Sequence, residues 1–366
     1  MYLHVISMTS MSPYLTLRNQ YNGVVKYSLV HCHFSHFFSS TIITFNCNHQ
    51  TTLRNTVFSH SLSTPLKFIS SECGIGSDGS AINMPIENKT IESKHAFFKS
   101  GCGNISIHFC SFIDCYSSNE PGGSLWINQE CTAIIHGTIF SKSRTTTNRG
   151  GACCIAKKIG INSDDIDPKD ERISSLNIQY CCFSDCYPNG KNDTLYGLAL
   201  FIAAEDAVFY FSSTINCPPK NKPYRSKGAQ VDIQAENVKS KNINITGGRS
   251  KFCAGIEYRY ATMGHFMFQT ITQIEECMFA TSLTNVNISG LTLSYSNYDS
   301  NRLINSADKS DVHLYPALIH VRYKKIEISH FCFTNFIDDS NLKNAKIISR
   351  GTYYYNLITG ERINCE

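Results

Sequence analysis

A short pattern recurs along most of the chain, and it constrains the fold more than any other feature. In the clearest copy, the aliphatic residue Ile107 stands five residues before an anchor residue, Phe112. The small residue Cys110 stands two before the anchor, and Cys115 stands three after it. Other copies keep this spacing, and their anchors are Phe34, Phe58, Phe140, Phe183, Thr214, Phe279 and Phe333. Self-similarity of this kind is typical of a repeat architecture, so the repeat decides the fold.

A second pattern follows several copies of the first. It is clearest in Gly122-Gly-Ser-Leu-Trp-Ile127, and related segments begin at Gly150, Gly197, Gly228 and Cys253. The fourth and sixth residues are apolar or aromatic, whereas the fifth varies: Trp126, Cys154, Phe201, Asp232 and Glu257. Alternation with period two predicts a half-buried strand whose fourth and sixth residues face inward and whose fifth faces outward. The leading glycines suit a tight bend into that strand.

The spacing of the anchors favours one architecture. Successive anchors are 24, 54, 28, 43, 31, 65 and 54 residues apart. The intervals of 54 and 65 fit two coils with a degenerate middle copy, which gives about ten to twelve coils. Like residues in successive copies are what a parallel β-helix requires, because neighbouring coils stack equivalent positions about 4.8 Å apart. We therefore predict an all-β chain, folded over residues 1–366 as a single right-handed parallel β-helix solenoid.

Two segments interrupt the repeat. Residues 156–175 form a polar, acidic insertion, and residues 297–311 form a second polar loop. Carboxylates at the density of the first segment can bind calcium, and those available are Asp164, Asp165, Asp167, Asp170 and Glu171. Their order does not match known calcium loops, so we interpret the segment as a solvated insertion.

Composition excludes several classes of protein. An apolar content of 42% with 17% charged residues supports a folded chain, and the net charge of +4 is spread rather than striped, so no nucleic-acid partner is expected. No segment is apolar enough for a membrane span. The first residues make a poor secretory signal, which leaves open a chain that stays inside the cell and a chain that lacks its signal and anchor.

The 17 cysteines suggest packing more than redox chemistry. Many occupy the two small-residue positions of the repeat, where they alternate with Ser and Thr. Cys110 and Cys181 should lie two coils apart, too far for a disulfide, whereas Cys186 and Cys217 should lie in successive coils and could bond. Cysteine and histidine residues near the N-terminus could hold zinc, but they should not all point to the same side of their strands. They are His31, Cys32, His33, His36, Cys47 and His49. We expect no metal and no cofactor.

Three short strings bear on catalysis: Asn162-Ser-Asp164, Gly264-His265 and Arg322-Tyr-Lys324. In this order they resemble motifs of the polygalacturonases, members of the pectin-lyase-like superfamily of right-handed β-helices. That resemblance implies paired carboxylates that perform acid and base catalysis. The chain departs from it, because no Gly-Asp-Asp string is present and Phe266 follows His265. We expect Asp164, Asp165, His265 and Arg322 to be dispersed, and we assign no catalytic residue.

Other strings resemble the polymorphic membrane protein type of surface repeat, which carries Gly-Gly-Ala-Ile and Phe-x-x-Asn. The matching segments are Gly122-Gly-Ser-Leu125, Gly150-Gly-Ala-Cys153, Phe112-Ile-Asp-Cys115 and Phe183-Ser-Asp-Cys186. The similarity covers about residues 110–235, and each string departs at its fourth position. It implies adhesion at a cell surface.

These observations predict a non-enzymatic surface or adhesion-type repeat protein that binds glycan or protein partners. The alternatives are a carbohydrate-active enzyme, either a polysaccharide lyase or a glycoside hydrolase, and an intracellular interaction solenoid. The partner-binding strip would be the outward aromatic pair Trp126 and Phe201, unless the insertion at residues 156–175 folds over it. Asp232 and Glu257 should lie close together on successive coils, without a basic partner in the repeat. In the core, we expect Phe183→Asp to unfold the central coils and Ser143→Ala to be nearly silent.

Overall fold

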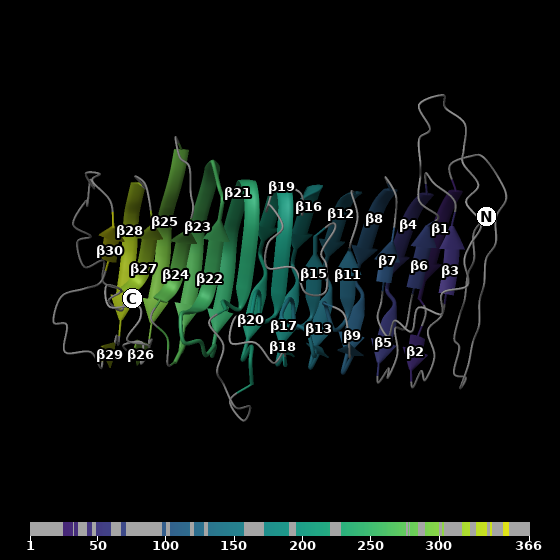
Figure 1. Ribbon diagram of the computed structural model, residues 1–366, viewed down its shortest axis with the longest axis horizontal. Helices are drawn as coiled ribbons and strands as arrows, with labels where there is room; N and C mark the ends of the chain where they lie inside the picture. Colours follow the sequence, from purple (N-terminus) through teal and green to yellow (C-terminus); the bar gives the residue numbers. More distant parts are fainter. Residues whose placement is uncertain are drawn as a thin grey trace.

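The computed structural model describes most of the repeat region. The described residues are 25–31, 33–35, 42–45, 49–59, 67–70, 97–99, 103–117, 121–127, 131–156, 172–189, 195–219, 228–275, 277, 279–284, 290–299, 302–303, 317–322, 327–334, 337–338 and 347–350. This part of the chain is all-β, contains no helix, and joins 25 strands in one sheet whose pairings are all parallel. Figure 1 shows the strands stacked along the long axis from the N-terminal to the C-terminal end.

The parallel pairings form three ladders. Ladder 1 contains β1 (Val25–Val30), β4 (His49–Arg54), β8 (Gly103–His108), β12 (Cys131–His136), β16 (Ile173–Gln179), the end of β19 (Leu200–Tyr210), the middle of β21 (Val231–Thr246), and the first parts of β23 (Met263–Thr272), β25 (Gly290–Asp299) and β28 (Glu327–Thr334). Ladder 2 contains β2 (His33–Ser35), β5 (Val57–Ser59), β9 (Ser111–Ile113), β13 (Ile139–Ser141), β17 (Cys182–Ser184), β20 (Ser213–Ile215) and the last parts of β21, β23, β25 and β28.

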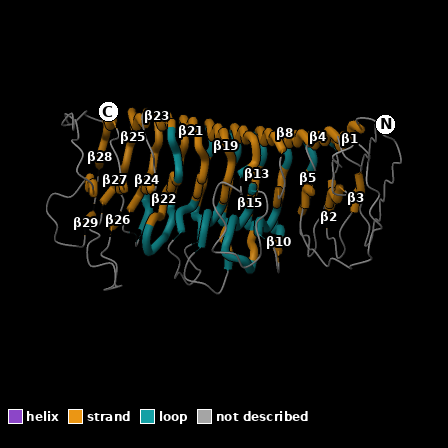
Figure 2. The backbone as a smooth tube through the Cα atoms, turned by 45° about the horizontal axis from the view of Figure 1, so that its top comes forward, coloured by secondary structure: helices purple, strands orange, loops and turns teal. Residues whose placement is uncertain are grey.

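Ladder 3 contains β3 (Ile42–Phe45), β6 (Lys67–Ser70), β7 (Phe97–Lys99), β11 (Leu125–Ile127), β15 (Cys153–Ile155), the first parts of β19 and β21, β22 (Cys253–Arg259), β24 (Phe279–Thr284), β27 (Ala317–Arg322) and β30 (Ile347–Arg350). Two small parallel sheets complete the structure: β10 (Tyr116–Ser117), β14 (Arg144–Thr145) and β18 (Tyr187–Pro188), and β26 (Arg302–Leu303) with β29 (Ile337–Asp338). Figure 2 shows the described loops gathered along one edge of this stack of strands.

The anchor residues pair in register along ladder 2, as the repeat predicts. The column reads Phe34, Phe58, Phe112, Phe140, Phe183, Thr214, Ile245, Ile271, Tyr298 and Phe333. The assignment of Phe279 is wrong, because this residue begins β24 in ladder 3 and pairs with Cys253 and Ala317. The copy around it matched the spacing of the repeat but not its register.

The 54-residue interval between Phe58 and Phe112 also differs from the prediction. These two anchors pair directly, so the interval adds one step to ladder 2. It adds two successive strands to ladder 3, however, namely β6 and β7. The degenerate middle copy is therefore present in one ladder only.

Where a small residue stands two before an anchor, it has a defined role at the corner between ladders 1 and 2. Its side chain donates a hydrogen bond to the carbonyl oxygen two residues earlier: Cys110 Sγ at 3.3 Å, Thr138 Oγ1 at 3.2 Å, Cys181 Sγ at 3.3 Å and Ser212 Oγ at 2.8 Å. Each of these carbonyl oxygens also accepts a backbone N–H from the neighbouring step, and its second lone pair can take the donor that Cys, Thr and Ser all supply. This explains why the three residue types alternate in the sequence.

Eleven cysteines of the described residues are free thiols, and all of these but Cys182 are buried. Cys186 and Cys217 lie on successive steps as predicted, with the Cys186 backbone N–H donating to Cys217 Sγ at 3.3 Å. The sulfur of each also donates to the carbonyl two residues before it. These thiols donate to carbonyl groups at the end of the ladder 2 strands, as Cys110 and Cys181 do at the corner between ladders 1 and 2.

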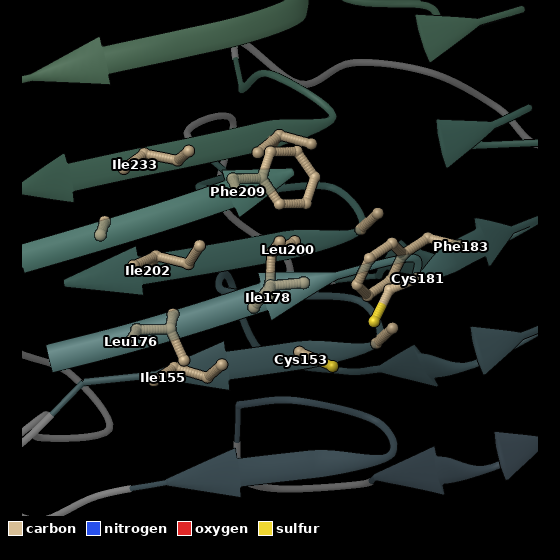
Figure 3. Packing of buried hydrophobic residues seen from close by; sticks show 14 of the residues in the cluster. Cys153, Ile155, Leu176, Ile178, Cys181, Phe183, Leu200, Ile202, Phe209 and Ile233 are labelled. Carbon is tan, nitrogen blue, oxygen red and sulfur yellow. The ribbon is translucent and has the colours of Figure 1, made fainter. Parts of the chain in front are cut away.

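The core lies between the ladders. The fourth and sixth positions of the glycine-led segments are buried, as predicted, and examples are Cys153, Ile155, Leu200 and Ile202. Figure 3 shows these side chains of ladder 3 packed with Leu176, Ile178 and Phe209 of ladder 1 and with Phe183 of ladder 2. Gly150 leads into one such strand with a φ of 60°, and a Cβ there would collide with the carbonyl oxygen of Cys153.

Both predicted loops overlap described strands. β16 begins at Ile173, so the end of the predicted insertion at 156–175 is strand, and residues 157–171 lie outside the described residues. β25 continues to Asp299, so the second loop at 297–311 begins later than predicted. Residues 302–303 of that loop form β26, and its residues 300–301 and 304–311 lie outside the described residues. No helix in the described part of the chain could span a membrane.

Candidate functional site

The fifth position of the glycine-led segments forms one column along ladder 3. Trp126 pairs with Cys154, which pairs with Phe201, and the column continues through Asp232 and Glu257. The register predicted from the sequence is therefore confirmed. These side chains point away from the main core, because Trp126, Cys154 and Phe201 belong to a separate buried cluster.

The column is covered, so of the two alternatives left open by the sequence the structure favours the buried strip over the exposed one. Trp126 is 5% exposed and Phe201 is fully buried. Tyr196 packs on the cluster, and the Arg149 guanidinium lies 5.1 Å from the centre of the Phe201 ring. Ala156, the first residue of the predicted insertion, is also part of the cluster. A half-buried pattern shows which side chains avoid the core, but not whether loops cover them.

The column ends in a buried cluster of two carboxylates and an arginine. Nη2 of Arg259 lies 2.6 Å from Oε2 of Glu257 and 3.2 Å from Oδ2 of Asp232. Thr284 Oγ1 donates to the other Glu257 oxygen at 3.2 Å. The Arg259 guanidinium also lies over the Tyr196 ring, 4.9 Å from its centre. The acid pair is thus adjacent as predicted, and its basic partner, Arg259, comes from outside the repeat pattern, where the sequence reasoning did not look.

Asp232 has an unusual protonation equilibrium. Burial, together with the neighbouring Glu257 charge, raises the pKa of its carboxyl group to about 7 against the opposing effect of Arg259. A carboxyl group with this pKa can act as a general acid or base. Asp232 is fully buried and Glu257 is 2% exposed, so a substrate cannot reach either carboxyl group in this structure. The shared Arg259 compensates the negative charge of this buried acid pair.

The residues of the three catalytic strings are not assembled in the described part of the chain. His265 lies on β23 in ladder 1 with an exposed side chain, whereas Arg322 ends β27 in ladder 3. Asp164 and Asp165 lie outside the described residues. The dispersal of all four residues therefore stays a prediction.

Metal binding finds no support in the described residues, where no three His, Cys, Asp or Glu side chains are grouped to hold an ion. Three of the candidate zinc ligands, Cys32, His36 and Cys47, lie outside the described residues, as do all five carboxylates of the acidic insertion.

A row of exposed aromatic side chains was missed by the sequence reasoning. Phe109, Tyr180, Phe211 and Phe268 each stand three residues before an anchor, at the corner between ladders 1 and 2. We call these four residues the corner aromatic row. Their exposed fractions are 50%, 53%, 43% and 41%. The signal in the sequence is an aromatic residue three before the anchor, directly before the small residue of the repeat. The hydrophobic pattern of the repeat does not include this column.

The row has an unusual backbone conformation. φ is 52° at Phe109, 55° at Tyr180, 50° at Phe211 and 52° at Phe268. Positive φ suits glycine and asparagine and is unfavourable for bulky side chains. The same corner on other steps carries Asn55, Gly137 and Asn242, which are residues that tolerate it.

The aromatic side chains of the corner contact one another. The Tyr180 and Phe211 rings are stacked, with centroids 4.9 Å apart and planes 3° apart. At the Gly137 step the ring of His136 fills the gap, 5.3 Å from Phe109 and 5.1 Å from Tyr180. The row therefore forms one continuous exposed surface from Phe109 to Phe211.

Neither a protein-family model nor a curated protein matches this chain.

Proposed function

We propose that the chain is a right-handed parallel β-helix of the pectin-lyase-like type, and that its three ladders are the faces of successive coils. Support comes from β21, which passes from ladder 3 through ladder 1 to ladder 2 within one strand. The in-register anchor column has ten steps within the described residues, in keeping with the predicted coil number. We also propose that its repeats are related to those of the polymorphic membrane proteins, which the sequence strings resemble.

On this fold, the chain acts as a non-enzymatic surface or adhesion-type protein that binds a glycan or protein partner along the corner aromatic row. The observation that carries this function is the combination of exposure and positive φ at four aromatic residues. Backbone conformations of this kind cost on the order of 1–3 kcal/mol each and concentrate at functional sites. Exposed aromatic surface on a stable scaffold is typical of partner recognition. A fold without a partner would do better with Asn at each corner.

The carbohydrate-active alternative has one observation in its favour, namely the adjacent acids Asp232 and Glu257 with the raised pKa of Asp232. Glycoside hydrolysis needs two carboxyl groups about 5–10 Å apart on either side of a bound sugar. Here both groups contact the same arginine and are covered. The binding function therefore accounts for more of the structure than catalysis does.

The test replaces three of the four residues of the row with a residue that suits their corners. In the triple Asn variant, Tyr180→Asn, Phe211→Asn and Phe268→Asn, each new residue suits the positive φ of its position. Parent and variant are assayed by direct binding to immobilised neutral and acidic oligosaccharides and to purified surface proteins. We expect the variant to bind at least tenfold more weakly to whichever of these probes the parent binds.

The matched control is Met263→Ser, which removes an exposed apolar side chain from β23 outside the row. It should leave binding unchanged. Equal binding by the parent and the triple Asn variant would refute the proposed role of the row. Hydrolysis or elimination of a glycan, lost in Asp232→Asn, would instead establish the enzyme.

A further inference from the structure

The charges beside the corner aromatic row are all of one sign. The columns four and six residues before the anchors lie next to the row on ladder 1, and their basic members are Arg54, His108, His136, Lys239, Lys241 and His265. We call these six residues the basic flank. Across the seven steps from the Phe58 to the Ile271 anchor, the columns six, four, three and one before the anchor contain no Asp or Glu.

The basic flank is accessible and electrostatically coupled. Arg54, Lys239 and His265 are exposed, and the remaining three are partly exposed. Partial burial lowers the pKa of His108, and the nearby His136 and Arg54 lower it further, so the permanent positive charges of the flank are those of Arg54, Lys239 and Lys241. Lys241 Nζ lies 5.5 Å from the centre of the Phe268 ring, so flank and row meet at this point.

The geometry of the rings favours one kind of partner. Tyr180 and Phe211 stack face to face with planes only 3° apart, so each covers a face of the other. Sugar rings and nucleic-acid bases bind aromatic residues mainly through an open ring face. Apolar side chains, in contrast, can pack against ring edges as well as against ring faces, so a continuous row of edges suits them. The exposed Ile139, one residue before its anchor, extends this apolar surface on the other side of the row.

We propose that the corner aromatic row and the basic flank together bind an acidic segment of a partner protein that also carries apolar side chains. The inference rests on the proposed binding function and names the class of its partner. Carboxylates of the segment would face the basic flank, and its apolar side chains would cover the row. Charge complementarity of this type sets specificity and speeds association.

The probe is a fluorescent 16-residue peptide of alternating Glu and Leu, titrated with the intact chain at 0.15 M salt and followed by anisotropy. Matched probes are the peptide with Lys in place of Glu, a sulfated polysaccharide, and a single-stranded oligothymidine. We expect the Glu-Leu peptide to bind, the Lys-Leu peptide to bind at least tenfold more weakly, and the affinity for the Glu-Leu peptide to fall as salt is raised.

Two variants separate the apolar and charged contributions. Lys239→Glu with Lys241→Glu reverses the charge of the basic flank, and we expect it to weaken the Glu-Leu peptide at least tenfold, as the triple Asn variant should. The control is Lys142→Glu with Lys251→Glu, which makes the same charge change at two exposed lysines outside the flank. The control should bind like the parent.

The outcomes distinguish the inference from the function on which it rests. If the triple Asn variant loses a partner while the charge reversal has no effect, the partner is not acidic and only the inference fails. Tighter binding of the polysaccharide or the oligonucleotide through the same residues would assign a different class of partner and overturn it too. No binding of the Glu-Leu peptide at millimolar concentration also overturns it. If neither variant changes the binding of any probe, the proposed function fails as well.

Discussion

At the scale of single residues, the fold places two kinds of side chain where local preferences argue against them. Tyr180 and Phe211 are bulky residues at positive φ with their rings in solvent, and Asp232 is a carboxyl group in a buried position. None of the aromatic residues of the row belongs to the main core. Asp232 is held by one arginine that it shares with Glu257.

The raised pKa of Asp232 predicts a pH dependence of stability. In the unfolded chain its pKa is near the ordinary value of 3.8, whereas in the folded chain it is about 7. The folded state holds the proton more tightly, so this group favours folding fully below about pH 4, and the advantage disappears as pH rises through 7. We expect Asp232→Asn to remove this dependence. Between pH 4 and 8 the free energy of unfolding of the parent should fall relative to that of the variant by on the order of 2–4 kcal/mol.

Urea denaturation of both proteins across this pH range measures the difference directly, and other titrating groups cancel in the comparison. Parallel pH profiles of the two proteins would mean that Asp232 is ionised in the folded state at all these pH values, and that Arg259 outweighs its burial.

At the scale of strands and corners, the core is built from stacked equivalents. Phe112, Phe140 and Phe183 lie parallel, with centroids 5.0 and 4.9 Å apart and interplanar angles of 4°. These separations match the spacing of about 4.8 Å between neighbouring strands. At the corner beside them, the thiol and hydroxyl donors give a second hydrogen bond to carbonyl groups that already accept a backbone N–H from the neighbouring step.

The corner role of cysteine predicts different effects for two substitutions at one site. Burial raises the pKa of the Cys181 thiol to about 12, so it remains a donor and bonds the Gln179 carbonyl oxygen at 3.3 Å. Cys181→Ser keeps a donor and should change the free energy of unfolding by less than about 0.5 kcal/mol, whereas Cys181→Ala should cost about 0.5–1.5 kcal/mol, because the Gln179 carbonyl oxygen keeps the backbone N–H of Gly137. Equal loss in both, measured by chemical denaturation, would show that sulfur packing matters and the hydrogen bond does not.

Ser143 corrects an expectation drawn from the repeat. Its position accepts any small residue in the sequence pattern, which predicts that Ser143→Ala is nearly silent. In the structure its buried Oγ shares a hydrogen bond with Ser124 Oγ at 2.5 Å. We now expect Ser143→Ala to lower the free energy of unfolding by about 1–2 kcal/mol, because it leaves the Ser124 hydroxyl without this partner. The double change with Ser124→Ala should recover part of the loss, and purely additive losses would contradict the account.

At the scale of the whole molecule, the sequence predicts what the repeat encodes and misses what it does not. The columns of Phe112 and Trp126 follow from spacing, because equivalent residues stack in parallel ladders. The burial of Trp126 and the position of Arg259 depend on loops and on residues outside the repeated motif. The corner aromatic row was missed because hydrophobic periodicity identifies core positions and carries no information about positive φ. Phe279 shows that spacing without register can mislead.

The central claim is that the corner aromatic row is kept for binding and not for folding. The measurement that tests it most directly is the free energy of unfolding of the triple Asn variant, by denaturant titration beside the parent. Relief of the positive-φ cost, about 1–2 kcal/mol per residue, should offset the lost ring contacts, about 0.5–1.5 kcal/mol per pair. We predict a variant at least as stable as the parent, within about 1 kcal/mol, that no longer binds the partner. A loss of more than about 3 kcal/mol would show that the rings hold the fold together and would contradict the account.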